Sequence, residues 1–231
     1  MIDFTDTLKE LRKKLRTREN GPASEAMEKL GIKYNRNHGL AVREIKTLAE
    51  SYKYNHELAL ELHFKDIREL VLMSFMIENP ETVECSQIQL WLTELKDTEQ
   101  AEQIAINLIT EASHCHNKFN EWANIENDFA VRAIFLSIAR IAMTKADIFN
   151  NSDFEEFINL CVLKSDKEHI NIAKAISFAL RRIGRINKYL RKQSLIAIDK
   201  IKESDYENSQ IIYEEVYFEL TDEFIVSTIK D

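Results

Sequence analysis

One stretch near the carboxyl end of the chain combines a high density of positive charge with an aromatic ring. Between residues 171 and 202, nine Lys or Arg accompany a single acid. In a helix, Lys174, Phe178, Arg181 and Arg185 fall within an arc of roughly 60° on one side, and Arg182 belongs to the same basic run. Lys and Arg neutralise phosphates, while a ring among them can stack on a base or press on a sugar. The pattern predicts a nucleic-acid contact.

The element that must position these side chains is an amphipathic helix. Its opposite side is aliphatic, with Ile172, Ile176, Ala179 and Ile183, so that side is expected to face the core. A second interpretation fits the same pattern, because charge runs commonly mark a solvated helix face and a Phe among them can pack under a neighbouring helix. The pattern alone leaves both interpretations open.

Charge is distributed unevenly along the chain. The whole sequence has a net charge of −8, whereas residues 171–202 carry +8 and residues 203–231, with one Lys and nine acids, carry −8. An acidic total does not exclude DNA as a partner, because the local field near a basic patch matters more than the sum. The acidic segment 203–231 is expected either to lie over the basic helices or to form capping helices with a polar outer face.

A second basic helix is expected at the amino terminus. It carries Lys9, Arg12, Lys13, Lys14, Arg16 and Arg18. These cations would either add phosphate contacts or form a solvated face.

Composition predicts an almost entirely helical chain. Its 231 residues are 45% apolar and include only four Gly and two Pro, so few tight turns can form. Expected helices include 41–52, 65–78, 97–114, 167–184, 187–202 and 206–219. From about residue 65, helix pairs recur at intervals of about 30 to 40 residues, as in HEAT-like repeats. We expect an all-α fold: an α-α superhelix, or HEAT-like repeat solenoid, forming a single domain over 1–231, with acidic capping helices at 203–231. A compact bundle is the alternative.

Several classes of site and location have little support in the sequence. There is no apolar signal core and no stretch long enough to span a bilayer, so a cytoplasmic protein is expected. Cys85, Cys115 and Cys161 are odd in number and scattered, which indicates reduced thiols. His114 and His116 flank Cys115, but adjacent helical residues point 100° apart, so no metal site is expected. Without a glycine-rich phosphate loop, no nucleotide or other cofactor is expected either.

Four segments together resemble one protein family. LGIKYNRNHGLAVREIKTLAESYKYNHELALELHFKDIREL is followed by LMSFMIENP and LWLTELKDTEQAEQIA, and KAISFALRRIGRIN comes near the end. The order of these segments, covering about residues 27–200, is similar to that of the AlkD-like DNA alkylation repair proteins. Members of that family are solenoids of HEAT-like repeats that hold duplex DNA in a basic concave groove. Active members remove cationic alkylated purines by cutting the N-glycosidic bond.

The resemblance implies roles for particular residues. A catalytic Trp of the family and the Asp four residues later match Thr98 and Glu102, and a one-position slip would bring in Glu99. A second family Trp, within the KAI and ALR signature, is matched by Phe178, and a family Arg by Arg132. A fixed carboxylate and electron-rich rings stabilise the oxocarbenium-like sugar that forms as a cationic base departs. The altered positions therefore imply weak or altered alkylpurine N-glycosylase activity, and leave open whether the chain is an enzyme.

Two functions of different classes follow. The first is a monomeric, DNA-binding HEAT-like protein of the alkylation repair family that recognises damaged or distorted duplex DNA, including alkylated DNA. Its expected DNA-binding residues are Lys174, Phe178, Arg181, Arg182, Arg185 and Arg132, with Glu102 as the catalytic candidate. The alternative is a non-enzymatic HEAT-type scaffold whose groove binds an acidic protein or peptide.

Overall fold

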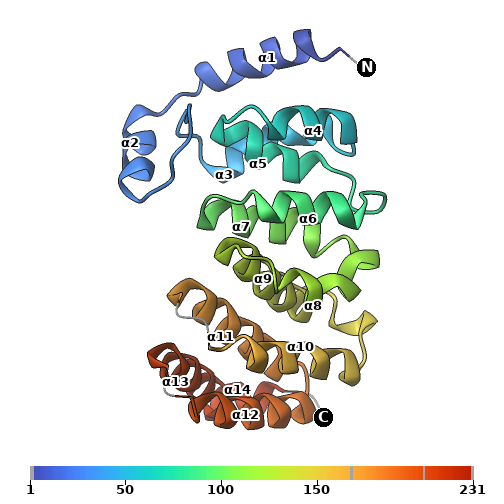
Figure 1. Ribbon diagram of the computed structural model, residues 1–231, viewed down its shortest axis with the longest axis vertical. Coiled ribbons are helices and arrows are strands. Elements are labelled where there is room, and N and C mark those ends of the chain that lie inside the picture. Colours follow the sequence, from blue (N-terminus) through green and yellow to red (C-terminus); the bar gives the residue numbers. More distant parts are fainter. Residues whose placement is uncertain (1–2, 167–168, 205, 230–231) are drawn as a thin grey trace. The chain divides into compact units, whose positions relative to one another are not determined.

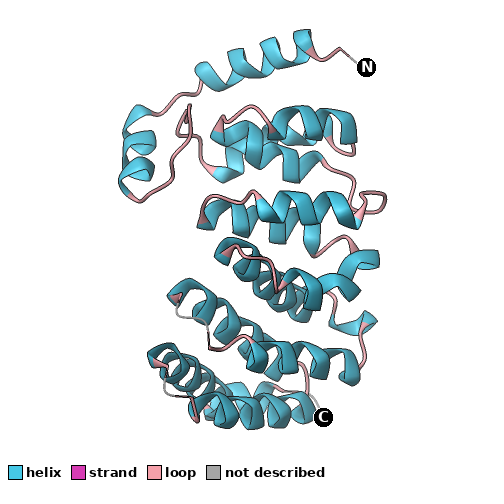
Figure 2. Cartoon of the chain, in the orientation of Figure 1, coloured by secondary structure: helices cyan, strands magenta, loops and turns pink. Residues whose placement is uncertain are grey.

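The computed structural model describes residues 3–166, 169–204 and 206–229 (Figure 1). Within these ranges the chain is helical, without a strand longer than the isolated bridge between Arg36 and Ile67 (Figure 2). The all-α prediction is confirmed. The chain divides into two compact units, residues 1–116 and 117–231, and a single domain stays a prediction. In the described part, each helix is too short or too polar to cross a lipid bilayer.

Unit 1 is built around a buried helix. Its helices are α1 (Thr5–Arg16), α2 (Gly21–Lys29), α3 (Val42–Ala49), α4 (His56–His63), α5 (Arg68–Ile77), α6 (Cys85–Thr93) and α7 (Thr98–Ile104). All ten residues of α5 are buried, and α3, α4 and α7 pack against it. The loop before α3 needs a glycine at position 39. The backbone φ angle there is +73°, and an added Cβ atom would lie 2.1 Å from the Asn20 carbonyl oxygen.

Unit 2 places a basic helix between two neighbours. Its helices are α8 (Phe119–Trp122), α9 (Asp128–Thr144), α10 (Asn151–Leu163), α11 (Ile170–Gly184), α12 (Lys188–Lys202), α13 (Glu207–Thr221) and α14 (Glu223–Thr228). Helix α11 packs against α9 on one side and α13 on the other, while α10 and α12 form a second layer (Figure 1). This two-layer arrangement of helix pairs fixes which face of α11 remains outside.

Asparagine and aspartate side chains start many of these helices. A side-chain oxygen of each accepts a backbone N–H from the first turn, which satisfies a donor that has no partner within the helix. Such caps stand at Asn20, Asn55, Asp97, Asn127, Asn150, Asn187 and Asp222. At Asn150, Asp153 completes a capping box.

The largest departure from the predicted helices lies after α7. A continuous helix over 97–114 is wrong, because α7 ends at Ile104 and a π-helical turn follows over Ala105–Ile109. Thr110 closes that turn, with its backbone N–H and its hydroxyl both donating to the Ala105 carbonyl, at 3.1 and 2.7 Å. A 3₁₀ segment, Ser113–Lys118, comes next. For the basic helix, the predicted start at residue 167 lies outside the described residues.

The expectation of three reduced cysteines is wrong for two of them. Cys85, at the start of α6, and Cys115, in the 3₁₀ segment, form a disulfide whose Cα atoms are 5.6 Å apart. Cys161 on α10 is a free, buried thiol, and burial raises its pKa far above the usual range. The sequence did not indicate the pairing because it depends on how α6 and the 3₁₀ segment pack, across a separation of 30 residues.

Candidate nucleic-acid interface

Helix α11 has one buried side and one basic side. The buried side includes Ile172, Ile176, Ala179 and Ile183, which are at most 1% exposed. On the outer side Lys174 and Arg185 are exposed, while Phe178, Arg181 and Arg182 are half-buried. The spacing of four, three and four residues aligns Lys174, Phe178, Arg181 and Arg185 along the helix. We call the five outer residues, Lys174, Phe178, Arg181, Arg182 and Arg185, the α11 stripe.

Phe178 lies beneath two guanidinium groups. The Cζ atoms of Arg182 and Arg181 are 5.1 and 5.8 Å from the centroid of its ring. These distances fit cation–π attraction, which holds the ring and the charges together. Because the ring keeps part of its surface in solvent, the stripe offers both positive charge and an aromatic edge.

Two glutamates of α13 neutralise part of this charge. Glu219 forms ion pairs with Arg181 and Arg182 at 3.0 Å and with Arg185 at 3.3 Å. Glu215 accepts a 2.6 Å hydrogen bond from Ser177 and lies 3.6 Å from Arg181. Three guanidinium groups thus share two carboxylates. Around them lies an open cavity of about 580 Å³, and Asp222 lies in the same cavity with Phe218 and Ile225.

Burial and the neighbouring charges together lower the pKa of Arg182. Burial lowers the pKa of its guanidinium, and the positive charges of Arg185 and Arg181 act in the same direction, whereas Glu219 raises it. Removing Glu219 would therefore leave the three neighbouring guanidinium groups with less negative charge to balance their repulsion. The arrangement favours any anion that can take the place of this carboxylate.

The close approach of α13 depends on a glycine at the end of α11. A Cβ atom at Gly184 would lie 2.4 Å from a methyl carbon of Leu220, which is fully buried. Arg191 on α12 adds a 2.7 Å hydrogen bond to the Leu220 carbonyl oxygen. These contacts hold Glu215 and Glu219 over the α11 stripe.

Arg132 contacts the opposite end of the same helix. It extends from α9 and donates a 3.0 Å hydrogen bond to the Asn171 carbonyl oxygen, in the first turn of α11. The side chain is half-buried, and the bond fixes the start of α11 three residues before Lys174. The structure thus brings Arg132 to the helix that carries the α11 stripe.

Unit 1 carries a second basic surface of its own. It is an open cavity of about 820 Å³ between α1 and the end of α4. Its lining includes Lys9, Arg12, Lys13 and Arg16 on α1, Glu61 on α4, and Lys65 just after α4. Lys65 pairs with Glu61, whereas the four α1 cations form no ion pair among the described residues. The basic amino-terminal helix predicted from sequence therefore borders a groove.

The catalytic candidates lie in unit 1, on α7. Thr98 is the first residue of α7 and Glu102, four residues later, is half-buried and engaged in an interaction. Glu99 forms an ion pair with Arg68, in which both carboxylate oxygens accept hydrogen bonds of 2.6 Å. Burial raises the pKa of Asp97, the N-cap. The structure thus places Glu99 in an ion pair with Arg68, and the role of Glu102 stays a prediction.

Comparison with known proteins decides the family. The chain matches the family described as "DNA alkylation repair enzyme" over residues 11–204. The chain belongs to this family. The resemblance seen in the sequence is confirmed, although none of the curated proteins matches the chain significantly.

One solved structure has the same fold as this chain. The two match with a TM-score of 0.74 and 15% sequence identity, over 94% of this chain and 95% of the other. That structure is described as "A new family of proteins related to the HEAT-like repeat DNA glycosylases with affinity for branched DNA structures". The HEAT-like repeat fold predicted from the helix pairs is therefore confirmed.

Sequence reasoning missed the two residues that partner the stripe. Glu215 and Glu219 are four residues apart and share one face of α13. Their spacing was visible, but nothing in the sequence showed that this face meets α11. Glu215 and Glu219 of the acidic segment thus lie against α11, and capping by the segment 203–231 stays a prediction.

Proposed function

We propose that the chain is a DNA-binding HEAT-like protein that recognises damaged or distorted duplex DNA through the α11 stripe. The single observation that carries the proposal is an aromatic ring, Phe178, held under two guanidinium groups on a half-exposed helix face. Membership of the DNA alkylation repair family supports DNA as the partner. The affinity for branched DNA named for the similar structure favours distorted DNA over regular duplex.

Each part of the stripe has a distinct task in this proposal. Lys174 and the three arginines neutralise phosphates, while Phe178 packs on a sugar or on a base that distortion has unstacked. Arg132 orients the first turn of α11 by its bond to Asn171. The four α1 cations beside the groove of unit 1 add phosphate contacts.

Binding at the stripe is an exchange of anions. A phosphate takes the place of Glu219 at three arginines, so the protein must release ion pairs of 3.0 to 3.3 Å as it gains DNA contacts. This exchange lowers affinity for any single phosphate. It favours DNA, which presents several phosphates at once, over a single anion.

A salt titration tests the proposal. Binding of fluorescein-labelled three-way-junction DNA is followed by polarisation between about 50 and 300 mM NaCl, with unlabelled junction, unlabelled linear duplex and a poly-glutamate peptide as competitors. We expect log affinity to fall with log salt with a slope of about −0.9 per neutralised phosphate, and the junction to compete best. A flat salt response would contradict DNA binding.

One observation favours the alternative of a scaffold for acidic partners. The α11 arginines already hold an acidic helix of this same chain, through Glu215 and Glu219. An acidic helix from another protein could make the same contacts. In the titration above, poly-glutamate competing better than either DNA would favour this second function.

Glycosylase activity, if present, is expected to be weak. Glu102 stands where the resemblance implies an Asp, and a displacement of about 1 Å can cost about a hundredfold in rate. Thr98 supplies no ring for cation–π stabilisation, which costs a further three- to thirtyfold, from about 0.5 to 2 kcal/mol. The family's catalytic pair is thus replaced by a longer carboxylate without its aromatic partner.

Base release from duplex DNA containing 7-methylguanine or 3-methyladenine measures this activity. We expect release at or just above the spontaneous rate, and we expect Glu102→Gln to abolish any excess. Glu111→Gln, which removes an exposed carboxylate of unit 1 beyond α7, is the control. Rapid release would contradict the expected weakness, and an excess that survives in Glu102→Gln would contradict the role of Glu102.

A further inference from the structure

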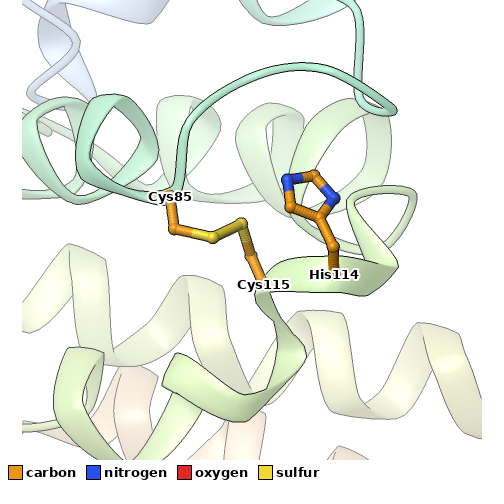
Figure 3. A group of neighbouring side chains, drawn as sticks. All are labelled: Cys85, His114 and Cys115. Carbon is orange, nitrogen blue, oxygen red and sulfur yellow. A yellow bond between two sulfur atoms is a disulfide. The ribbon is translucent and has the colours of Figure 1, made fainter.

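Two sulfur atoms and an imidazole meet in unit 1, away from the α11 stripe. One ring nitrogen of His114 and the Sγ atoms of Cys85 and Cys115 all lie within 4.8 Å of one another (Figure 3). The residues come from the start of α6 and from the 3₁₀ segment Ser113–Lys118. Thiolate and imidazole are the ligands that zinc prefers in proteins.

His114 and Cys115 are neighbours in a 3₁₀ segment and not in the continuous helix predicted over 97–114. Successive residues of an α-helix point 100° apart, which argues against His114 and Cys115 binding one ion. Successive residues of the 3₁₀ segment Ser113–Lys118 point about 120° apart, so the segment alone does not bring the two side chains together. They meet at Cys85 of α6, whose Sγ atom lies within 4.8 Å of both the Cys115 Sγ atom and a ring nitrogen of His114.

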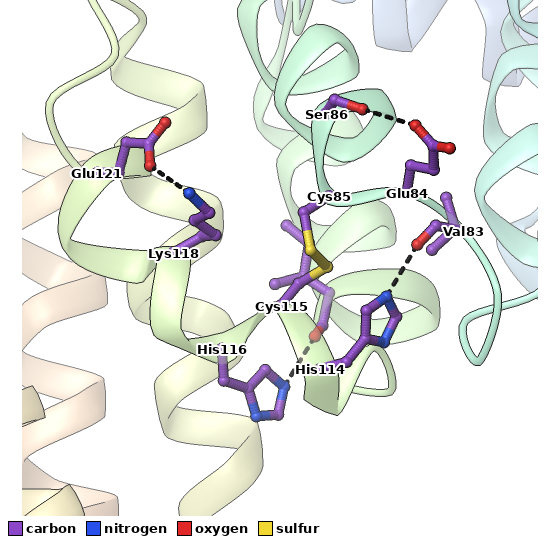
Figure 4. Close-up of a disulfide and its surroundings, with 10 residues drawn as sticks. Val83, Glu84, Cys85, Ser86, His114, Cys115, His116, Lys118 and Glu121 are labelled. Atoms are coloured by element: carbon purple, nitrogen blue, oxygen red, sulfur yellow. Dashed lines mark hydrogen bonds and ion pairs between the residues drawn. A yellow bond between two sulfur atoms is a disulfide. The ribbon is translucent and has the colours of Figure 1, made fainter.

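A hydrogen bond holds the imidazole in place. Nε2 of His114 lies 2.9 Å from the carbonyl oxygen of Val83, two residues before Cys85 (Figure 4). At zinc sites, one ring nitrogen binds the metal and the other commonly donates to a carbonyl. The ring is thus tied to the same segment that supplies one of the sulfurs.

We propose that Cys85, Cys115 and His114 form a redox-controlled zinc site. In the oxidised state, the two sulfurs are joined and do not bind metal. A dithiol reductant supplies two electrons and two protons, the Sγ–Sγ bond breaks, two thiols form, and the reductant leaves as its own disulfide. Zinc(II) then binds two thiolates and one ring nitrogen, and the two thiol protons pass to water.

Water completes the coordination. Three protein ligands and one water make the four-coordinate arrangement that zinc adopts at open sites. Cys85 and His114 keep access to solvent, while Cys115 is buried. In a reducing compartment, such as the cytoplasm expected from the sequence, the metal would tie α6 to the 3₁₀ segment in place of the disulfide.

Cobalt(II) and zinc(II) binding to the full chain tests the proposal. The protein is reduced with a phosphine in the absence of oxygen and titrated with cobalt(II), and thiolate-to-cobalt absorption is recorded before zinc displaces the cobalt. We expect one ion per chain, tetrahedral cobalt bands, and weakening by about a hundredfold or more in Cys85→Ser, Cys115→Ser and His114→Ala. The oxidised protein should bind neither ion.

The third cysteine provides the matched control. Cys161 lies in unit 2, on α10, so Cys161→Ala should bind as the wild type does. Circular dichroism of each reduced variant shows whether it is folded. No uptake by the folded, reduced wild type would overturn the proposal, and so would undiminished binding in His114→Ala or loss of binding in Cys161→Ala.

Discussion

Replacing Glu215 and Glu219 by glutamine is expected to tighten DNA binding by about ten- to a hundredfold at about 0.15 M salt. Both changes keep side-chain shape and remove the charge that neutralises Arg181, Arg182 and Arg185. Each phosphate contact adds about 0.9 to the salt slope, a gain of about fivefold in affinity between about 1 M and 0.15 M salt. Three freed arginines give the upper figure. Polarisation with junction DNA measures the change.

A second pair of substitutions separates this effect from net charge. Glu214→Gln and Glu223→Gln remove the same number of carboxylates from exposed positions on α13 and α14. Glu214 is hydrogen-bonded to Gln210 on its own helix and pairs with no arginine of the described residues. We expect this control to change affinity by no more than about threefold, because exposed charges are screened over about 8 Å. Equal gains in both variants would contradict the exchange of Glu219 for phosphate.

Substituting Arg68 by alanine is expected to destabilise unit 1 by about 3 to 5 kcal/mol. The Arg68 side chain is fully buried and donates two 2.6 Å hydrogen bonds to Glu99, one of 3.2 Å to Glu69 and one of 2.9 Å to the Leu40 carbonyl oxygen. Glu69 is also fully buried, and it accepts the backbone N–H of His38 at 3.1 Å. Without Arg68, two carboxylates would remain in or near the core with no cation between them.

The two tryptophans allow this loss to be measured in unit 1 alone. Trp91 is buried in unit 1 and Trp122 in unit 2. In a Trp122→Phe background, fluorescence during urea unfolding reports on the surroundings of Trp91. Arg43→Ala, at an exposed position of α3, is the control and should change the free energy of unfolding by less than about 0.5 kcal/mol. A loss below about 1 kcal/mol for Arg68→Ala would show that the network is not what holds α5 in place.

Most helices could be predicted from features of the local sequence. Few glycines and prolines, aliphatic spacing and asparagine caps such as Asn150 and Asn187 are all visible along the chain. The π-helical turn after α7 was not, because no glycine or proline marks it and Thr110 closes it through its hydroxyl. The Cys85–Cys115 pairing was also missed, since it depends on packing between segments 30 residues apart.

The candidate interface was predictable in composition but not in its partners. Helical spacing aligned Phe178 with its neighbouring cations, and the structure leaves that side of α11 partly in solvent. Arg132 was matched by family resemblance alone, and its bond to Asn171 explains why an arginine suits that position. The pairing of Glu219 with three arginines needed the structure, because it depends on the contact between Gly184 and Leu220.

The salt dependence of junction-DNA binding by an α11 variant tests the central claim most directly. Arg181→Ala, Arg182→Ala and Arg185→Ala together remove three guanidinium groups from the stripe. Lys188→Ala, Lys192→Ala and Lys200→Ala remove the same charge from exposed positions on α12. If α11 contacts phosphates, the arginine variant loses about 2 to 3 units of salt slope while the lysine variant keeps nearly all of it. Equal slopes in the two variants would contradict DNA binding at α11.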